Sequence, residues 1–134
     1  MKILIFILGM VMFISFGTEQ QEKTKKSKNK AEIKQSADSV EYDLLVFDSG
    51  FNTYLAKIPY SKDYHTNNYY KNWNIRYVTE WNIRAQNPAR YGIFYESQID
   101  YQSNIDYGLD LNFKLYHYFR YIEDTHDIVL IRRK

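Results

Sequence analysis

The longest regular pattern of apolar and polar positions in the chain covers residues 69–84. This stretch contains no proline or glycine, and large aromatic side chains recur in it at spacings of three, four and four: Tyr70, Trp73, Tyr77 and Trp81. Such spacings place the rings on one stripe and predict an amphipathic helix with an aromatic buried face. Pro88 ends this helix, and three upstream residues are candidate N-caps: Ser61, Asp63 and Thr66. We expect this aromatic stripe to be the heaviest apolar element, with the rest of the domain covering it.

Shorter patterns lie on both sides of this helix. Residues 40–47 begin with alternation and end in a continuous apolar run, which predicts a strand. Residues 48–52 carry turn-forming side chains, and residues 53–58 fit either a short helical turn or a second strand. A second helix is predicted from Asp106 or Asp110 to about residue 123. The apolar run at residues 128–131 is predicted to be a closing strand.

Together these elements predict an α+β fold: a small single domain with two or more strands in one sheet, covered by two main helices. The strands at residues 40–47 and 128–131 are the expected partners. Parallel and antiparallel pairing both remain open.

The N-terminal region differs from the rest of the chain. Lys2 followed by an apolar stretch at residues 3–16 is typical of a signal peptide, and the small residues Ser15 and Gly17 suit cleavage after residue 17. An uncleaved N-terminal membrane anchor is the second choice. Residues 18–39 are rich in lysine and poor in apolar side chains, so we expect a disordered tether with possible peripheral membrane contact through its lysines. The folded domain is then residues 40–134, in an exported protein of the periplasm or cell envelope.

Composition narrows the function classes. Aromatic residues make up 18% of the chain, with 14 tyrosines, which fits either a tyrosine-rich core boundary or an exposed recognition surface. From Glu41 onward eleven Lys or Arg residues face twelve Asp or Glu residues, so the net charge of +2 does not indicate a nucleic-acid-binding face. The absence of cysteine excludes disulfides, thiolate metal sites, a cysteine nucleophile and a lipid anchor.

Several motifs resemble those of one known family. They include Tyr-Asp-Leu-Leu-Val at residues 42–46, Asp48-x-Gly50-Phe51, the Tyr-Val-x-Glu-Trp-Asn-x-Arg run at residues 77–84, and the aromatic segments at residues 95–101, 104–108 and 111–119. Together they resemble the Bacteroidota envelope family catalogued as domain of unknown function 6146. The resemblance implies export and one small domain, and it brings no activity, cofactor or catalytic residue. Family members often look like lipoproteins and often carry proline where this chain has Ser49.

The sequence gives little support for catalytic residues. The histidines, His65, His117 and His126, form no HExxH motif, so we expect no metal site. No serine elbow or phosphate-binding glycine loop is present, and no cofactor is expected. The alternative function is a small cell-wall sugar or peptide hydrolase with a carboxylate pair, formed by Asp48 and a second acid. The candidates for that second acid are Asp106, Asp100 and Glu96.

The preferred interpretation is a non-catalytic binding domain for an envelope protein or glycan. The tetrapeptide Trp-Asn-Ile-Arg occurs twice, eight residues apart, which places the copies on roughly the same side of a helix. Either these polar residues form a solvated face, with Glu80 paired to Arg76 or Arg84, or they form a polar and aromatic ladder that binds a ligand. The predicted binding residues of that ladder are Asn74, Arg76, Asn82, Arg84, Tyr95 and Tyr101.

Overall fold

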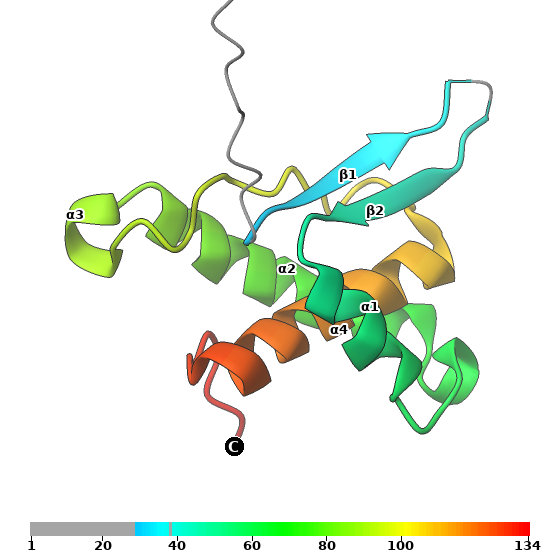
Figure 1. Ribbon diagram of the computed structural model, residues 1–134. Helices are drawn as coiled ribbons and strands as arrows, with labels where there is room; N and C mark the ends of the chain where they lie inside the picture. The colour runs from blue at the N-terminus through cyan, green and yellow to red at the C-terminus, as the bar shows by residue number, and fades with distance from the viewer. Residues whose placement is uncertain (1–28, 38) are drawn as a thin grey trace, which may run out of the picture.

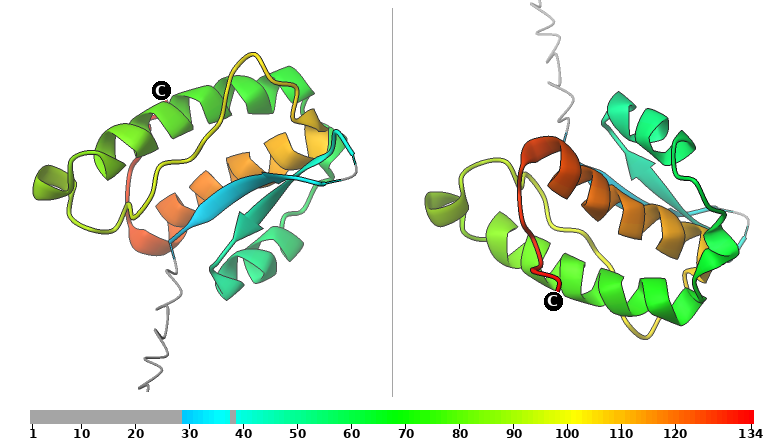
Figure 2. Two further views of the ribbon diagram at one scale, coloured as in Figure 1. Left: turned by 90° about the horizontal axis from the view of Figure 1, so that it is seen from above. Right: turned by 90° about the horizontal axis from the view of Figure 1, so that it is seen from below.

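Helix α4 (Gly108–His126) lies in the middle of the molecule, with other elements on two sides (Figures 1 and 2). The computed structural model describes residues 29–37 and 39–134. On one side of α4 lies the long helix α2 (Asn67–Ala85); on the other lie a β-hairpin and the short helix α1 (Ser49–Ala56). Nine residues of α4 are buried, compared with five of α2. The central element is therefore α4, and the expectation that α2 would be central is wrong, although the α+β class is confirmed.

The sheet of the described region is an antiparallel hairpin of β1 (Ala31–Gln35) and β2 (Tyr42–Val46), in which Ala31 pairs with Val46 and Gln35 with Tyr42. Strand β2 lies within the predicted strand at residues 40–47, but its partner differs from the prediction. Ala31 is buried beside Leu44 in the core. The predicted disordered tether is therefore wrong at residues 31–35, because pairing with β2 supplies order that this polar stretch cannot supply alone. The predicted signal peptide at residues 1–17 and residues 18–28 of the predicted tether lie outside the described residues.

Residues 48–52, predicted as a turn, form the start of α1 instead. Asp48 is the N-cap, and its Oδ1 accepts the Gly50 N–H at 2.9 Å. Its Oδ2 accepts the Tyr121 hydroxyl of α4 at 2.8 Å. A Cβ atom on Gly50 would lie 2.5 Å from that hydroxyl, so glycine is needed for the close approach. Together with the buried Phe51, these residues fasten α1 to α4.

Helices α2 and α4 run side by side in roughly the same direction (Figure 2). Thr66 is the N-cap of α2, since its hydroxyl accepts the Tyr69 N–H at 3.2 Å. Three of the four rings of the predicted stripe are fully buried against α4: Tyr70, Tyr77 and Trp81. Trp73 departs from the prediction, because it lies half-buried at the edge of the helix interface.

Two irregular segments complete the core. The short helix α3 (Pro88–Tyr91) leads into residues 92–107, which return along α2 to the start of α4. After α4, Asp127 adopts a left-handed conformation, with φ of 53°, and turns the chain back. Residues 128–131, predicted as a strand, form no strand; Leu130 is buried, and the backbone is held by a side chain of α4 described below.

Candidate functional site

The six predicted binding residues do not form one surface. Asn74 is fully buried, and its amide donates to the Asn112 carbonyl at 2.9 Å. Asn82 accepts the Ile99 N–H at 2.8 Å and donates to the Ile99 carbonyl at 2.9 Å, which fastens the return segment to α2. Both asparagines thus have structural partners within the domain.

Of the remaining four predicted residues, three also have hydrogen-bond partners among the described residues and one does not. Arg84 is paired with Glu80 at 2.7 Å, as the spacing of four predicted, and also donates to the Tyr95 hydroxyl and the Val129 carbonyl. Tyr95 is buried, and the Tyr101 hydroxyl donates to Asn112 Oδ1 at 2.8 Å. Of the six, Arg76 alone is an exposed side chain without a hydrogen-bond partner in the described part of the chain.

The candidate catalytic carboxylates are separated. Asp48 contacts Tyr121 near the end of α4, whereas Asp106 accepts the Gly108 N–H at the start of α4. At 1.5 Å per residue these two points lie about 20 Å apart along the helix. A glycosidase needs its two carboxylates within roughly 5–10 Å of each other. Asp100 and Glu96 are exposed on the return segment, and neither is hydrogen-bonded to Asp48. The pairing of Asp48 with Asp106 is therefore wrong.

The three histidines are dispersed. His117 is buried among aromatic rings, and burial lowers its pKa to about 4, so it is neutral at pH 7. His65 stacks on Tyr69, with ring centroids 3.9 Å apart, and His126 packs on Phe94. Within residues 29–37 and 39–134 no three His, Asp or Glu side chains gather in a way that could hold a metal ion.

A different set of side chains forms a partly exposed band whose two halves are linked through the buried ring of Tyr116. It begins at Tyr64, which is 66% exposed and packs edge-on against His65. His65 stacks on Tyr69, and Tyr69 contacts Tyr116 of α4 at 5.9 Å between centroids. The band ends at Trp73, where two guanidinium groups lie over the indole. We call this band the aromatic–arginine strip and define it as Tyr64, His65, Tyr69, Trp73, Arg76 and Arg133.

Three parts of the chain build the strip. Residues 64–65 precede α2, and Tyr69, Trp73 and Arg76 follow at i, i+4 and i+7 along that helix, beside its buried stripe. Arg133 comes from the C-terminal segment. Its guanidinium carbon lies 4.3 Å from the centre of the Trp73 ring, and that of Arg76 lies 4.5 Å away. Both distances fit cation–π contacts.

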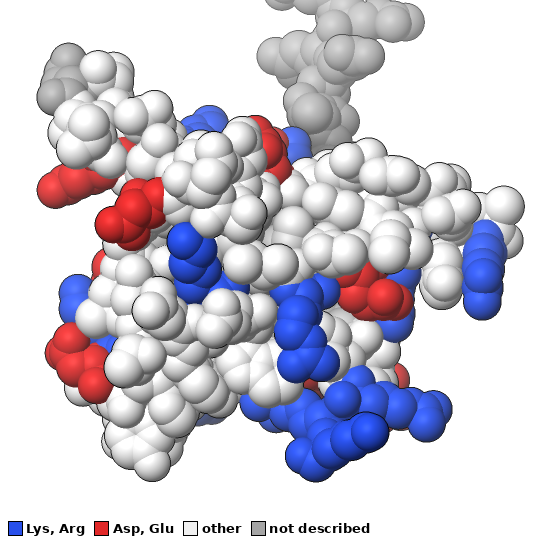
Figure 3. Space-filling view, turned by 180° about the vertical axis from the view of Figure 1, so that it is seen from behind, with Lys and Arg blue, Asp and Glu red and all other residues white. Residues whose placement is uncertain are grey.

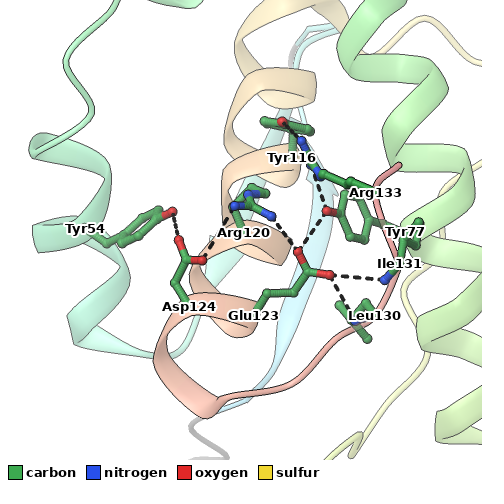
Figure 4. Close-up of polar contacts among 9 residues, drawn as sticks. All are labelled: Tyr54, Tyr77, Tyr116, Arg120, Glu123, Asp124, Leu130, Ile131 and Arg133. Carbon is green, nitrogen blue, oxygen red and sulfur yellow. Dashed lines mark hydrogen bonds and ion pairs between the residues drawn. The ribbon is translucent and has the colours of Figure 1, made fainter.

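A polar network fixes Arg133 in this place (Figure 4). Its two terminal nitrogens donate to the hydroxyls of Tyr116 and Tyr77, each at 2.9 Å. The Tyr77 hydroxyl donates in turn to Glu123, whose side chain is only 8% exposed. Glu123 also pairs with Arg120 at 2.9 Å. Arg133 is thus oriented by two tyrosines that α2 and α4 bring together.

Glu123 holds the backbone of the C-terminal segment as well. Its Oε1 accepts the N–H groups of Leu130 and Ile131 at 2.9 and 3.1 Å (Figure 4). Arg120 continues the network to Asp124 at 3.6 Å, and Asp124 accepts the Tyr54 hydroxyl of α1 at 2.8 Å. The carboxylates of this region are therefore occupied by internal partners, and Arg133 binds neutral phenols.

The network keeps its charges at neutral pH. Burial raises the pKa of Tyr116 to about 12, although the hydrogen bond from Arg133 opposes this shift. Burial by itself would lower the pKa of Arg133, but its hydrogen bonds to Tyr77 and Tyr116 outweigh burial, so the pKa is raised. The tyrosines stay neutral and Arg133 stays cationic.

A comparison of the chain with known protein families found a match. A family profile described as "Family of unknown function (DUF6146)" matches residues 5–131. The chain belongs to this family. No curated protein and no solved structure matches the chain. None of the helices within residues 29–37 and 39–134 has the length and apolar character needed to cross a membrane.

Part of the DUF6146 pattern now has a structural account. The motif Asp48-x-Gly50-Phe51 caps α1 and fastens it to Tyr121. Ser49 is the first residue of α1, a position that accepts proline. Residue Asn112, in the pattern at residues 111–119, receives bonds from both Asn74 and Tyr101. These motif residues support the fold.

Of the six members of the strip only Arg76 was predicted to bind; Trp73 was assigned to the buried stripe, and Tyr64, His65, Tyr69 and Arg133 were missed. Tyr69 carried a usable signal, because it precedes Trp73 and Arg76 at helical spacing. Tyr64 and His65 lie in a polar segment where single aromatic residues are ordinary. Arg133 reaches Trp73 only because the chain reverses at Asp127, which no local pattern indicates.

Proposed function

We propose that this protein is a non-catalytic binding domain of the cell envelope, and that its aromatic–arginine strip binds a glycan. The observation that supports this proposal is the strip itself: partly exposed rings and two guanidinium groups assembled from three separate parts of the chain. Aromatic rings offer stacking surfaces, and guanidinium groups offer several hydrogen-bond donors. Export is part of the proposal and is motivated by the apolar stretch at residues 3–16.

A protein partner is the other outcome that the experiment must separate. An affinity tag is inserted after Gly92, in an exposed turn where a Cβ atom added to the glycine would meet no other atom within 4 Å. A C-terminal tag is avoided because Arg133 belongs to the strip. Envelope fractions are cross-linked, captured through the tag, and analysed for both polysaccharide and protein.

The decisive comparison uses two variants. Tyr64→Ala combined with Trp73→Ala removes two rings of the strip. Tyr91→Ala is the matched control, since Tyr91 is a half-buried ring with Arg84 and Arg90 over it, at 5.5 and 5.1 Å. We expect captured glycan to be lost with the strip variant and kept with the control, while both retain their circular dichroism spectra. Glycan capture that survives the strip variant would contradict the proposal, and capture of protein alone would replace the glycan with a protein partner.

The hydrolase alternative has no structural observation in its favour. Asp48 is engaged by the Gly50 N–H and the Tyr121 hydroxyl, and Asp106 by the Gly108 N–H. Asp48→Asn keeps an oxygen to cap α1 but replaces the oxygen that accepts the Tyr121 hydroxyl, so it is expected to change stability and not an activity.

A further inference from the structure

Two arginine side chains lie on the Trp73 ring, a third lines a hollow with one of them, and within the described residues none of the three has a carboxylate partner. Arg76 and Arg133 share the Trp73 ring, and Arg76 and Arg132 line one surface hollow. Within the described residues, no Asp or Glu oxygen lies within 4 Å of any of these three guanidinium groups, whereas Arg84 and Arg120 each have one. Figure 3 shows basic side chains gathered at the lower edge of the face seen from behind, where the chain ends.

The hollow beside these arginines has a defined chemistry. It has a volume of about 440 Å³ and is lined by Ile75, Arg76, Thr79, Glu80, Leu130, Ile131 and Arg132. Glu80 is neutralised by Arg84 at 2.7 Å, and the Thr79 hydroxyl donates to the Ile75 carbonyl. The charged groups of the hollow that lack a partner among the described residues are thus positive. Its isoleucine and leucine side chains form an apolar part of the lining.

A neighbouring hollow provides a contrast within the same molecule. It shares Arg132 with the first hollow and is lined as well by Arg133, which the first hollow does not touch, but its lining includes Glu123, Asp124 and Asp127. Glu123 and Asp124 bind Arg120 there, so positive and negative groups are balanced. The excess of positive charge is therefore found at the first hollow, where Arg76 and Arg132 face no unpaired carboxylate in the described part of the chain.

We propose that Arg76 and Arg132, with Arg133 next to Arg76 on the Trp73 ring, form a binding site for a phosphate monoester whose uncharged part lies over Ile75 and Ile131. Arginine suits phosphate oxygens because its planar group donates two parallel hydrogen bonds. A phosphate monoester carries about −1.5 to −2 charges at pH 7, which matches several arginines better than a single carboxylate does. This inference rests on the proposed function, since it names the ligand chemistry of the same strip. A phosphorylated sugar of a glycan and the headgroup of a phosphatidic acid membrane both present this group.

The test titrates the full-length protein with glucose 6-phosphate, with glucose as the uncharged comparison, by isothermal calorimetry. A second arm measures binding to phosphatidylcholine vesicles with and without phosphatidic acid. The double variant Arg76→Gln, Arg132→Gln removes the hollow's free cations. Arg90→Gln is the matched control, because Arg90 is an exposed arginine that lies over Tyr91 of α3. Residues 1–28 are the same in every variant, so any contribution of these residues to binding is equal in all the proteins compared.

We expect saturable binding of at least one phosphate monoester and none of glucose, with a loss of about tenfold or more in the double variant and no change in the control. Binding should also weaken below about pH 6, where the phosphate takes up a proton. Which arm binds identifies the source of the phosphate. Absence of saturable binding in both arms, or an equal loss in Arg90→Gln, would overturn the site. If glycan capture depends on the strip while neither phosphate arm binds, the phosphate site fails and the proposed function stands.

Discussion

The tetrapeptide Trp-Asn-Ile-Arg occurs twice in α2, at residues 73–76 and 81–84, and the two copies have different surroundings. Trp81 is fully buried, and its indole N–H donates to the Ser97 carbonyl at 2.9 Å. Trp73 is half-buried with two guanidinium groups over its ring. Arg84 is engaged by three partners, whereas Arg76 contacts that ring and has no hydrogen-bond partner among the described residues.

The difference arises from an offset of eight residues, which turns the second copy by about 80° around the helix. That rotation is small on a helical wheel, yet it changes the surroundings: both copies contact α4 and the C-terminal segment, and the second is also held by the return segment at residues 95–99. For the tryptophan and the arginine, the same sequence thus supplies partly exposed side chains in the first copy and buried or hydrogen-bonded ones in the second. Four pairs of substitutions test this contrast.

The largest difference is expected between the tryptophans. Trp81→Ala removes a fully buried ring and its hydrogen bond, and should cost about 3–5 kcal/mol of unfolding free energy. Trp73→Ala removes a half-buried ring at an edge and should cost about 1 kcal/mol. Urea denaturation followed by circular dichroism measures both. Equal losses would mean that Trp73 is as much a core residue as Trp81.

The asparagines should have similar costs and different local effects. Asn74→Ala removes the buried side-chain donor to the Asn112 carbonyl, and Asn82→Ala leaves both polar groups of Ile99 without the partners that Asn82 supplies; each should cost about 1–3 kcal/mol. Hydrogen exchange separates them. The Ile99 amide should exchange faster in Asn82→Ala and remain protected in Asn74→Ala. Equal exchange in the two variants would show that Asn82 does not hold the return segment.

The arginines should separate stability from binding. Arg84→Gln loses bonds to Glu80, Tyr95 and Val129, and should cost about 1–2 kcal/mol. Arg76→Gln should stay within about 0.5 kcal/mol of the unmodified protein. Thermal unfolding measures both variants. A large loss in Arg76→Gln would indicate a structural role for this residue and would weaken its place in the strip.

The isoleucines should show the smallest contrast. Ile83 is 45% exposed, so Ile83→Ala should change the unfolding free energy by no more than about 0.5 kcal/mol. Ile75 lines the hollow and is half-buried, so Ile75→Ala should cost about 1 kcal/mol. The comparison is made by urea denaturation, from the midpoints of variants whose unfolding free energy depends equally on urea concentration. A reversed order would show that the hollow is open to water down to the α2 backbone.

Much of the fold could be predicted from local patterns. The spacing of Tyr70, Tyr77 and Trp81 was sufficient to predict α2, and the apolar run at residues 40–47 was sufficient for β2. Strand β1 was missed because five residues with a single large apolar side chain, Ile33, carry little periodic signal. Residues 128–131 were misassigned because an apolar run looks the same whether sheet partners or one carboxylate, here Glu123, satisfy its backbone.

The candidate site was less predictable than the fold. Arg76 was identified from its position in the repeated tetrapeptide, but Asn74 and Tyr95 proved to be buried. Spacing along one helix tells which residues share a face. It does not tell which face another helix covers, and that decides whether a polar residue binds a ligand or a backbone group.

The sequence by itself determined the two long helices, one strand, the α+β class and the family, because these depend on periodicity and motif within short stretches. Only the tertiary structure decided which rings are core and which are surface, and which arginines of the described region lack a carboxylate. These properties depend on contacts between residues far apart in the chain, such as Arg133 with Trp73 and Asp48 with Tyr121. Burial and charge balance are set by such neighbours, and local sequence does not specify them.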